Sequence, residues 1–149
     1  MKAVIQRVTS ASVAVDGETI SKIAAGILIL LGVERGDREE ELNYLVKKTV
    51  GLRIFKDDDN NMNLSIKDVG GEALVVSQFT LCADINRGMR PSFVYAASPE
   101  KADQMYQQYC KQLISNRVQV QTGKFGAMMD VSLVNDGPVT IILESGNTY

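Results

Sequence analysis

The chain of 149 residues contains no histidine and only two cysteines, Cys82 and Cys110. Without histidine, neither a serine activated by imidazole nor a metal held by imidazole ligands can be built from its side chains. Any chemistry must therefore use backbone groups, hydroxyls, the other polar side chains or the substrate itself. Two cysteines do not suggest a disulfide framework, so we expect reduced thiols in a cytoplasmic protein. Nothing in the sequence lowers the pKa of either thiol, and we interpret both as packing residues.

The sequence also lacks long hydrophobic runs and a strong charge of one sign. No apolar run approaches membrane-spanning length, and the apolar stretch at the amino terminus is interrupted by Gln6 and Arg7. We therefore expect neither a signal peptide nor a membrane partner. The net charge of −2 gives no overall attraction to nucleic acid. An RNA partner would have to be held by local basic residues, for which Arg87, Arg90 and Lys124 are the candidates.

The composition and patterning indicate one ordinary globular domain over residues 1–149. Hydrophobic residues make up 45% and charged residues 23% of the chain, close to globular averages. There is no internal repeat, low-complexity tract or linker that would divide it.

The expected secondary structure combines two helices with a larger number of strands. One helix is predicted over residues 38–50, and another from Ser98-Pro99 to about Asn116. Strands are predicted over residues 3–15, 18–20, 26–33, 72–81, 117–122, 127–134 and 138–143. The segment 26–33 is apolar throughout, which is typical of a strand covered on both faces. Because the helices do not alternate with the strands, we expect an α+β fold with a curved or barrel-like, mainly antiparallel sheet packed on two helices.

The acidic run from Asp57 to Asn61 resembles the start of a calcium-binding loop. The match fails at Met62, where the loop needs glycine, and at Asp68, where it needs a bidentate glutamate. We interpret the run as a polar turn. No motif in the sequence predicts a metal site or a cofactor.

The segment Ser77-Gln78-Phe79-Thr80 is the first candidate site. It follows a buried apolar strand, and its polar residues indicate that the chain has reached the rim of the sheet or a pocket. As a nucleophile, Thr80 would need a general base, and without histidine only Lys, Asp, Glu, Tyr or an amino terminus is available. The alternative is that the backbone N–H groups of Gln78, Phe79 and Thr80 polarise a carbonyl, which needs no ionisable side chain.

The segment from Asn135 to Thr140 is the second candidate site. From its position between two predicted strands, Gly137-Pro138 is interpreted first as a hairpin turn. Proline cannot donate to a sheet ladder, however, and a Gly-Pro bond can be cis at a cost of only about 0.5–1 kcal/mol. A cis bond would present two adjacent carbonyls to one side. Such a rigid pair would act as a selectivity gate, by accepting a hydrogen bond from an amino group or by excluding a side chain.

Four segments, taken together and in this order, resemble the D-aminoacyl-tRNA deacylases. They are Ser77 to Leu81, Gly88 to Phe93, Gln121 to Gly126 and Asn135 to Thr140. The start of the chain, Ile5-Gln6-Arg7-Val8, is similar to the same family, so that the resemblance covers essentially the whole chain.

The resemblance implies a homodimer with two active sites at the dimer interface, each binding the 3′-terminal adenosine of an aminoacyl-tRNA. It implies that Ser77, Gln78, Phe79 and Thr80 hold the aminoacyl ester mainly through backbone groups. Gly137-Pro138 is implied to enter from the partner subunit as a cis peptide and to reject L-aminoacyl groups. Arg7 matches a position that supports this loop, and Phe125 and Met129 match positions that line the adenosine pocket.

The resemblance also implies a mechanism that fits the missing histidine. The ribose 2′-hydroxyl of the tRNA assists hydrolysis, which releases the free D-amino acid and tRNA. A backbone gate discriminates without reading side-chain identity, and glycine, which has no side chain, would pass it. Two other function classes remain open. One is a non-catalytic module that binds the acceptor end of tRNA; the other is a Thr- or Cys-dependent hydrolase of small esters, for which the sequence offers no base.

Overall fold

A 14-residue strand, β1 (Lys2–Val15), organises the sheet in the computed structural model, which describes residues 1–146. Along one edge β1 pairs antiparallel with β2 (Glu18–Ile23) and then β3 (Gly26–Gly32). Along its other edge it pairs antiparallel with β8 (Asp130–Glu144). Every second residue over the first half of β1 is buried, as expected for a strand with one face on the core.

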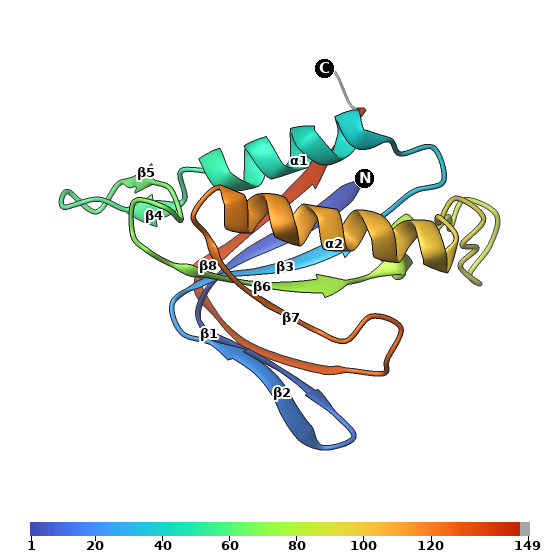
Figure 1. The fold of residues 1–149 in the computed structure, drawn as a ribbon, viewed down its shortest axis with the longest axis horizontal. Helices are drawn as coiled ribbons and strands as arrows, with labels where there is room; N and C mark the ends of the chain where they lie inside the picture. Colours follow the sequence, from blue (N-terminus) through green and yellow to red (C-terminus); the bar gives the residue numbers. More distant parts are fainter. Residues whose placement is uncertain (147–149) are drawn as a thin grey trace.

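The sheet continues from β3 through two parallel pairings. β3 pairs with β6 (Glu72–Ser77), and β6 pairs with β7 (Gln119–Thr122). The hydrogen-bonded path runs β2-β1-β3-β6-β7, and β8 pairs with β1 outside this path, along the edge opposite to β2 and β3. The sheet curls into a nearly closed, barrel-like shape (Figure 1). The predicted α+β architecture is confirmed, with antiparallel pairing around β1 and parallel pairing beyond β3.

Two helices, α1 (Glu39–Gly51) and α2 (Pro99–Ser115), lie side by side across one face of the sheet (Figure 1). The first turn of α1 contains three glutamates, and their negative charges interact favourably with the positive end of the helix dipole. At the start of α2, the Ser98 hydroxyl accepts a hydrogen bond from the Lys101 N–H at 3.4 Å, and proline takes the first helical position. Both predicted helices are confirmed to within one residue at each end.

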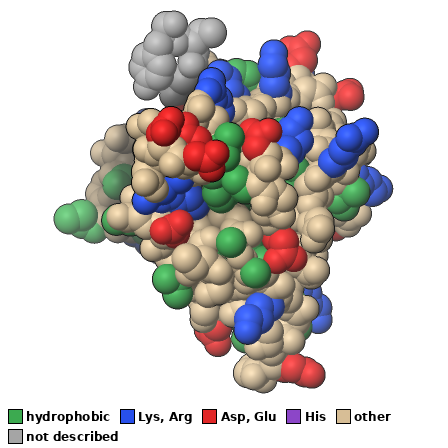
Figure 2. All heavy atoms as spheres, turned by 90° about the vertical axis from the view of Figure 1, so that its left-hand side faces the viewer, with side chains coloured by type: hydrophobic (Ala, Val, Ile, Leu, Met, Phe, Trp, Pro, Cys, Tyr) green, Lys and Arg blue, Asp and Glu red, His purple; other side chains and the backbone are tan. Residues whose placement is uncertain are grey.

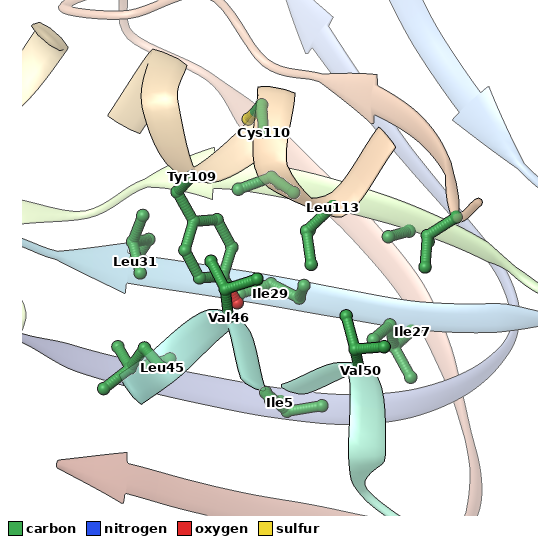
Figure 3. Packing of buried hydrophobic residues seen from close by; sticks show 14 of the residues in the cluster. Ile5, Ile27, Ile29, Leu31, Leu45, Val46, Val50, Tyr109, Cys110 and Leu113 are labelled. Carbon is green, nitrogen blue, oxygen red and sulfur yellow. The ribbon is translucent and has the colours of Figure 1, made fainter. Parts of the chain in front are cut away.

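The main core lies between the helices and the sheet (Figure 3). Tyr109 points from α2 toward Val46 of α1 and Ile29 of β3, and no part of its side chain is exposed. Its hydroxyl forms a hydrogen bond of 2.6 Å with the Thr49 hydroxyl of α1. This bond satisfies the two hydroxyl groups that the core would otherwise leave unpaired.

A smaller apolar cluster covers the other face of the central strands. It includes Leu28 of β3 and Leu74 and Val76 of β6, whereas their neighbours Ile29 and Val75 belong to the main core. The strand predicted over residues 26–33 is therefore covered on both faces, as its apolar run indicated.

Three of the predicted strands were wrong at the two places that matter most for a site. The strand predicted over residues 72–81 ends at Ser77 and is followed by a 3-10 turn, η1 (Phe79–Cys82). The strands predicted over 127–134 and 138–143 are one continuous strand, β8, so Gly137-Pro138 is not a hairpin turn. The register with β1 shifts around this dipeptide, which bulges out of the ladder before the strand resumes in the same direction.

The polar turn predicted at Asp57 is confirmed. It closes a hairpin between β4 (Phe55–Lys56) and β5 (Met62–Leu64), which the sequence did not predict. One carboxylate oxygen of Asp57 accepts hydrogen bonds from the N–H groups of Asp59 and Asn61, both at 3.0 Å. The Asp57 carboxylate therefore stabilises the turn by bonding its backbone N–H groups.

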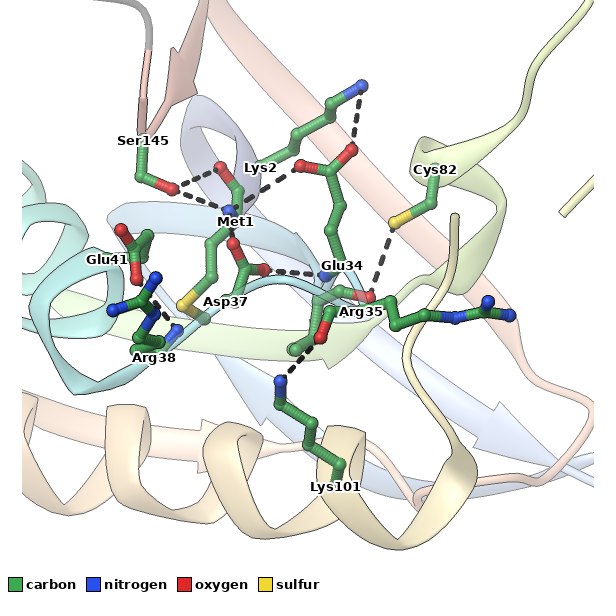
Figure 4. A network of polar contacts seen from close by, with 11 residues as sticks. Met1, Lys2, Glu34, Arg35, Asp37, Arg38, Glu41, Cys82, Lys101 and Ser145 are labelled. Atoms are coloured by element: carbon green, nitrogen blue, oxygen red, sulfur yellow. Dashed lines mark hydrogen bonds and ion pairs between the residues drawn. The ribbon is translucent and has the colours of Figure 1, made fainter. Parts of the chain in front are cut away.

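A polar network fixes the loop between β3 and α1 (Figure 4). The α-amino group of Met1 donates to the Asp37 carboxylate and to the Ser145 hydroxyl, which joins the loop to the ends of β1 and β8. The Lys101 ammonium donates to the Arg35 carbonyl at 2.7 Å and so ties the same loop to α2. This loop begins next to the candidate site described below.

The face that carries the β4–β5 hairpin and the carboxyl ends of both helices mixes basic and acidic side chains (Figure 2). No single sign of charge dominates it, so it offers no evident phosphate-binding surface. In residues 1–146, neither helix has the length and apolar character needed to cross a membrane.

Candidate functional site

A cavity of about 650 Å³ opens at the carboxyl end of β6. Three segments that are far apart in the sequence form its walls: the β6–η1 junction, the start of α2 and the loop between β7 and β8. The predicted residues among the lining are Ser77, Gln78, Phe79, Thr80, Phe125 and Met129. The fold thus brings together six of the nine predicted site residues.

Gly123 begins the loop between β7 and β8 and lies against the side chain of Met129. A Cβ atom at this position would lie 2.7 Å from the Met129 sulfur, so glycine makes room for Met129 against β6. The ring of Phe125 packs near Tyr106 of α2, with 6.0 Å between ring centroids. An apolar, aromatic wall of this kind suits a flat heterocyclic ring.

The backbone changes its hydrogen bonding at the point where β6 enters the cavity. The Gln78 N–H donates to the Leu31 carbonyl of β3 at 2.8 Å, which extends the sheet by one bond. The Gln78 N–H is therefore not available to a substrate, in contrast to the expectation from the sequence. The N–H groups of Phe79 and Thr80 have no acceptor within residues 1–146, because they begin the 3-10 turn.

The side chains of this segment are held by one another and by a neighbouring loop. The side-chain amide of Gln78 donates to the Thr80 hydroxyl at 2.5 Å. The Phe79 ring, 55% exposed, stands edge-on to Phe93 with 4.9 Å between centroids. Among the described residues, Gln78 is the only side chain hydrogen-bonded to Thr80, so the hydroxyl has an amide and not a base beside it.

The thiol and phenol groups near the cavity are protonated at neutral pH. Burial, and then the charge of Glu34, raises the pKa of the Cys82 thiol, which is 1% exposed. Burial raises the pKa of Cys110 to about 12. Both cysteines are free and buried, which confirms them as packing residues. Burial also raises the pKa of Tyr106, whose hydroxyl donates to the Val75 carbonyl at 2.8 Å. None of these groups is suited to act as a general base.

The other three predicted residues lie together, away from this cavity. Arg7, Gly137 and Pro138 are absent from its lining and meet at the bulge in β8. Arg7 is only 4% exposed; its Nε donates to the Asp136 carbonyl at 3.0 Å and its Nη1 to the Ile54 carbonyl at 2.5 Å. The Arg7 guanidinium therefore anchors the start of the bulge to the body of the protein.

The bulge requires glycine at position 137. Gly137 has φ +135°, and a Cβ atom there would lie 2.9 Å from the Val139 side chain and 3.1 Å from Nη2 of Arg7. The peptide bond between Gly137 and Pro138 is cis, and both residues are exposed. The dipeptide therefore projects from the β8 edge into solvent.

One residue of the bulge was missed by the sequence reasoning. The side chain of Asn135 accepts a hydrogen bond from the Val139 N–H at 2.7 Å and donates to the Thr140 hydroxyl at 3.0 Å. It lies within the segment from Asn135 to Thr140 that resembles the family, but the sequence alone indicated no role for its side chain. The signal that could have revealed it is the habit of asparagine side chains to bond nearby backbone groups in turns.

Three basic residues belong to segments that continue into the walls of the cavity, although none of them is part of its lining. Arg87 and Arg90 lie on an exposed loop whose base is closed by two backbone hydrogen bonds between Asp84 and Ser92, at 2.8 and 2.9 Å. The loop leads directly to the start of α2 (Figure 1), and Lys124 is adjacent in sequence to Phe125 of the opposite wall. None of the three makes an ion pair within the described residues. No cluster suited to a metal ion is found in residues 1–146.

Comparison with known proteins points to one family. The model of the D-Tyr-tRNA(Tyr) deacylase family matches residues 4–144. A D-aminoacyl-tRNA deacylase of Desulfatibacillum aliphaticivorans is 57% identical over 145 residues, which are 97% of this chain and 99% of the relative. One from Desulfitobacterium hafniense (strain DSM 10664 / DCB-2) is 51% identical over 149 residues, 100% of both chains.

Two solved structures have the same fold. The c-Myc DNA unwinding element binding protein superposes with a TM-score of 0.92 at 45% identity, over 97% of this chain and 99% of that chain. A probable eukaryotic D-amino acid tRNA deacylase superposes with a TM-score of 0.81 at 15% identity, over 96% and 98% of the two chains. The latter likeness is one of fold alone.

Proposed function

The chain belongs to the D-Tyr-tRNA(Tyr) deacylase family, and from its activity, the hydrolysis of D-aminoacyl-tRNA, we propose how its site selects and cleaves the substrate. Water is added across the ester between the amino acid and the terminal ribose, which yields the free D-amino acid and the free tRNA hydroxyl. Glycyl-tRNA is hydrolysed as well, and L-aminoacyl-tRNA is rejected.

One observation carries the catalytic part of this proposal. Phe79 and Thr80 line the cavity, and their backbone N–H groups have no acceptor among residues 1–146. The same lining is mostly apolar and contains no ionisable side chain. Backbone donors of this kind stabilise the oxyanion that forms when an ester carbonyl is attacked. Phe125 and Met129 hold the terminal adenine, and the ester carbonyl faces the Phe79–Thr80 donors.

The absence of a base assigns the proton-transfer step to the substrate. The ribose 2′-hydroxyl lies next to the ester oxygen on the same sugar and orients or activates the attacking water. Thr80 positions the ester and forms no covalent bond with it. The chemistry thus uses neither the Cys82 thiol nor the Tyr106 phenol, whose pKa values are both raised by burial.

The selectivity step is assigned to Gly137-Pro138 of a second subunit. In its own chain the dipeptide is exposed and lies outside the cavity lining, so it can act on an ester only if it reaches the site of another copy. A homodimer with a site at each side of its interface satisfies this requirement. The inserted backbone leaves room for hydrogen on one side of the α-carbon and excludes the side chain of an L-amino acid.

Arg87, Arg90 and Lys124 supply the phosphate contacts of the tRNA acceptor end. They belong to the loop before α2 and the loop between β7 and β8, and they have no ion-pair partners in the described part of the chain, which leaves their charges available. The two free, buried cysteines fit the reducing cytoplasm, where we place the enzyme.

The substrate-assisted mechanism is tested with D-tyrosyl-tRNA whose terminal adenosine lacks the 2′-hydroxyl and carries the ester on the 3′-hydroxyl. Hydrolysis by the enzyme is expected to be about 100-fold slower or worse than with the ordinary tRNA, the lower range of general acid–base catalysis. Equal rates for the two esters would rule out the assistance by the 2′-hydroxyl. Glycyl-tRNA, tested in parallel, is expected to be hydrolysed, and the mass of the enzyme in solution is expected to be that of a dimer.

A further inference from the structure

We propose that Asn135 is a positioning residue that fixes the shape of the Gly137-Pro138 bulge and thereby sets the discrimination between D- and L-aminoacyl-tRNA. The inference rests on the proposed function, in which this bulge is the selectivity gate. Among residues 1–146, the hydrogen bonds of the Asn135 side chain all go to its own strand, β8.

The bulge interrupts the pairing of β8 with β1. Val8 of β1 is opposite Asn135, and Gln6 is opposite Thr140, so the four residues between them on β8 face a single residue on β1. The backbone groups of these four residues therefore lack the regular partners that a ladder would give them.

The side chain of Asn135 replaces those partners at the far end of the bulge. Its oxygen accepts from the Val139 N–H at 2.7 Å, and its nitrogen donates to the Val139 carbonyl at 3.3 Å and to the Thr140 hydroxyl at 3.0 Å. A primary amide offers both an acceptor and two donors, so it can bond the two backbone groups of one residue as a neighbouring strand does. The residue held in this way directly follows Pro138.

The two ends of the bulge are held by different side chains. Arg7 bonds the Asp136 carbonyl at 3.0 Å, before the dipeptide, whereas Asn135 bonds Val139, after it. Arg7 is also bonded to the Ile54 carbonyl at 2.5 Å and so joins the bulge to a distant loop. Loss of Arg7 would disturb the fold more widely, while loss of the Asn135 amide removes bonds within β8 alone.

A loosened gate has a distinct kinetic signature. The catalytic segment Ser77 to Thr80 belongs to β6 and η1 and has no bond to Asn135 in the described structure. When the Asn135 side chain no longer bonds Val139, the gate becomes looser and L-aminoacyl-tRNA can enter the site. The backbone N–H groups of Phe79 and Thr80, which act on the ester, keep their positions. A variant that is simply less well folded would lose both activities in parallel and keep their ratio.

The test measures kcat/KM for D-tyrosyl-tRNA and L-tyrosyl-tRNA with the full chain and its Asn135→Ala variant. The ratio of D to L is expected to fall by about 5- to 150-fold, the effect of losing two hydrogen bonds. Asn135→Asp keeps the acceptor for the Val139 N–H and loses both donors, so it is expected to restore part of the ratio. Thr140→Val removes only the hydroxyl contact and is expected to have the smallest effect.

The variant Pro138→Ala distinguishes a failure of the gate hypothesis from a failure of the role proposed for Asn135. If Pro138→Ala lowers the D-to-L ratio and Asn135→Ala does not, the gate stands and the role of Asn135 is overturned. If neither variant changes the ratio, the gate itself is wrong. Should Asn135→Ala fail to fold by circular dichroism, Asn135→Asp and Thr140→Val decide, and a wild-type ratio in both would overturn the inference.

Discussion

The side-chain amide of Gln78 donates a hydrogen bond of 2.5 Å to the hydroxyl of Thr80 at the edge of the cavity. The bond leaves the hydroxyl proton free to donate elsewhere, but an amide cannot remove that proton. The one hydroxyl that the sequence offers as a nucleophile is thus oriented and not activated.

Replacement of Thr80 by alanine is therefore expected to leave substantial activity. Loss of one positioning hydrogen bond, about 0.5–1.5 kcal/mol, lowers kcat/KM for D-tyrosyl-tRNA by about 2- to 12-fold. Thr19→Ala, at an exposed threonine on β2, is the matched control and is expected to behave as the wild type. A loss of four orders of magnitude in a folded Thr80→Ala protein would restore the nucleophile hypothesis.

The hydrogen bond between Thr49 and Tyr109 is expected to contribute to stability, because both hydroxyls are buried between the helices. Tyr109→Phe leaves the Thr49 hydroxyl without its partner, and the free energy of unfolding in urea is expected to fall by about 1–3 kcal/mol. Tyr44→Phe, at a tyrosine on the exposed face of α1, is expected to have no measurable effect. Equal stability of the two variants would contradict this role of the buried pair.

The two thiols are expected to resist alkylation in the native enzyme. Burial raises the pKa of Cys82 and of Cys110 above the ordinary value, so both remain protonated near pH 8, where an ordinary exposed thiol is partly ionised. Iodoacetamide at pH 8 should label neither residue until denaturant is added, as followed by mass spectrometry, and activity should persist. Rapid labelling of Cys82 with a parallel loss of activity would instead indicate a cysteine-dependent hydrolase.

Arg87 and Arg90 are expected to govern the salt dependence of tRNA binding. Each phosphate contact contributes about 0.7–0.9 to the slope of log affinity against log salt concentration. Arg87→Gln/Arg90→Gln should therefore reduce that slope by about 1.4–1.8 in filter-binding or anisotropy measurements. Lys56→Gln/Lys67→Gln, at an exposed lysine of β4 and an exposed lysine that follows β5, is the control with the same change of net charge. If the two double variants have equal slopes of log affinity against log salt concentration, Arg87 and Arg90 do not contact the phosphates, and the tRNA binds another surface.

The parts of the fold that the sequence could predict are those set by local chemistry. Ser98 followed by Pro99 marks the start of α2, and the apolar run of β3 marks a strand covered on both faces. The Asp57 turn is likewise local, since its carboxylate bonds the backbone two and four residues further on.

The errors occur where distant pairing decides the structure. Gly137-Pro138 has the chemistry of a turn, but β1 pairs with β8 on both sides of it and keeps the strand in one direction. Similarly, the sequence indicated that the backbone N–H of Gln78 is free. In the structure it donates a hydrogen bond to the Leu31 carbonyl of the neighbouring parallel strand, β3. Neither pairing leaves a local signal in the sequence.

The site was partly predictable for the same reason. Its polar segments could be located by motif, whereas the meeting of Phe125 and Met129 with Ser77 to Thr80 depends on the path of β7 beside β6. The support given by Asn135 depends on how far the bulge leaves the ladder.

The most direct measurement compares the rates at which the enzyme hydrolyses D-tyrosyl-tRNA and L-tyrosyl-tRNA, with a buffer control for each ester. Rapid hydrolysis of the D ester, with the L ester decaying only at the buffer rate, is the expected result and would support both the reaction and its gate. Hydrolysis of both esters at similar rates would contradict the gate, and hydrolysis of neither would leave a protein that binds the acceptor end of tRNA without cleaving it.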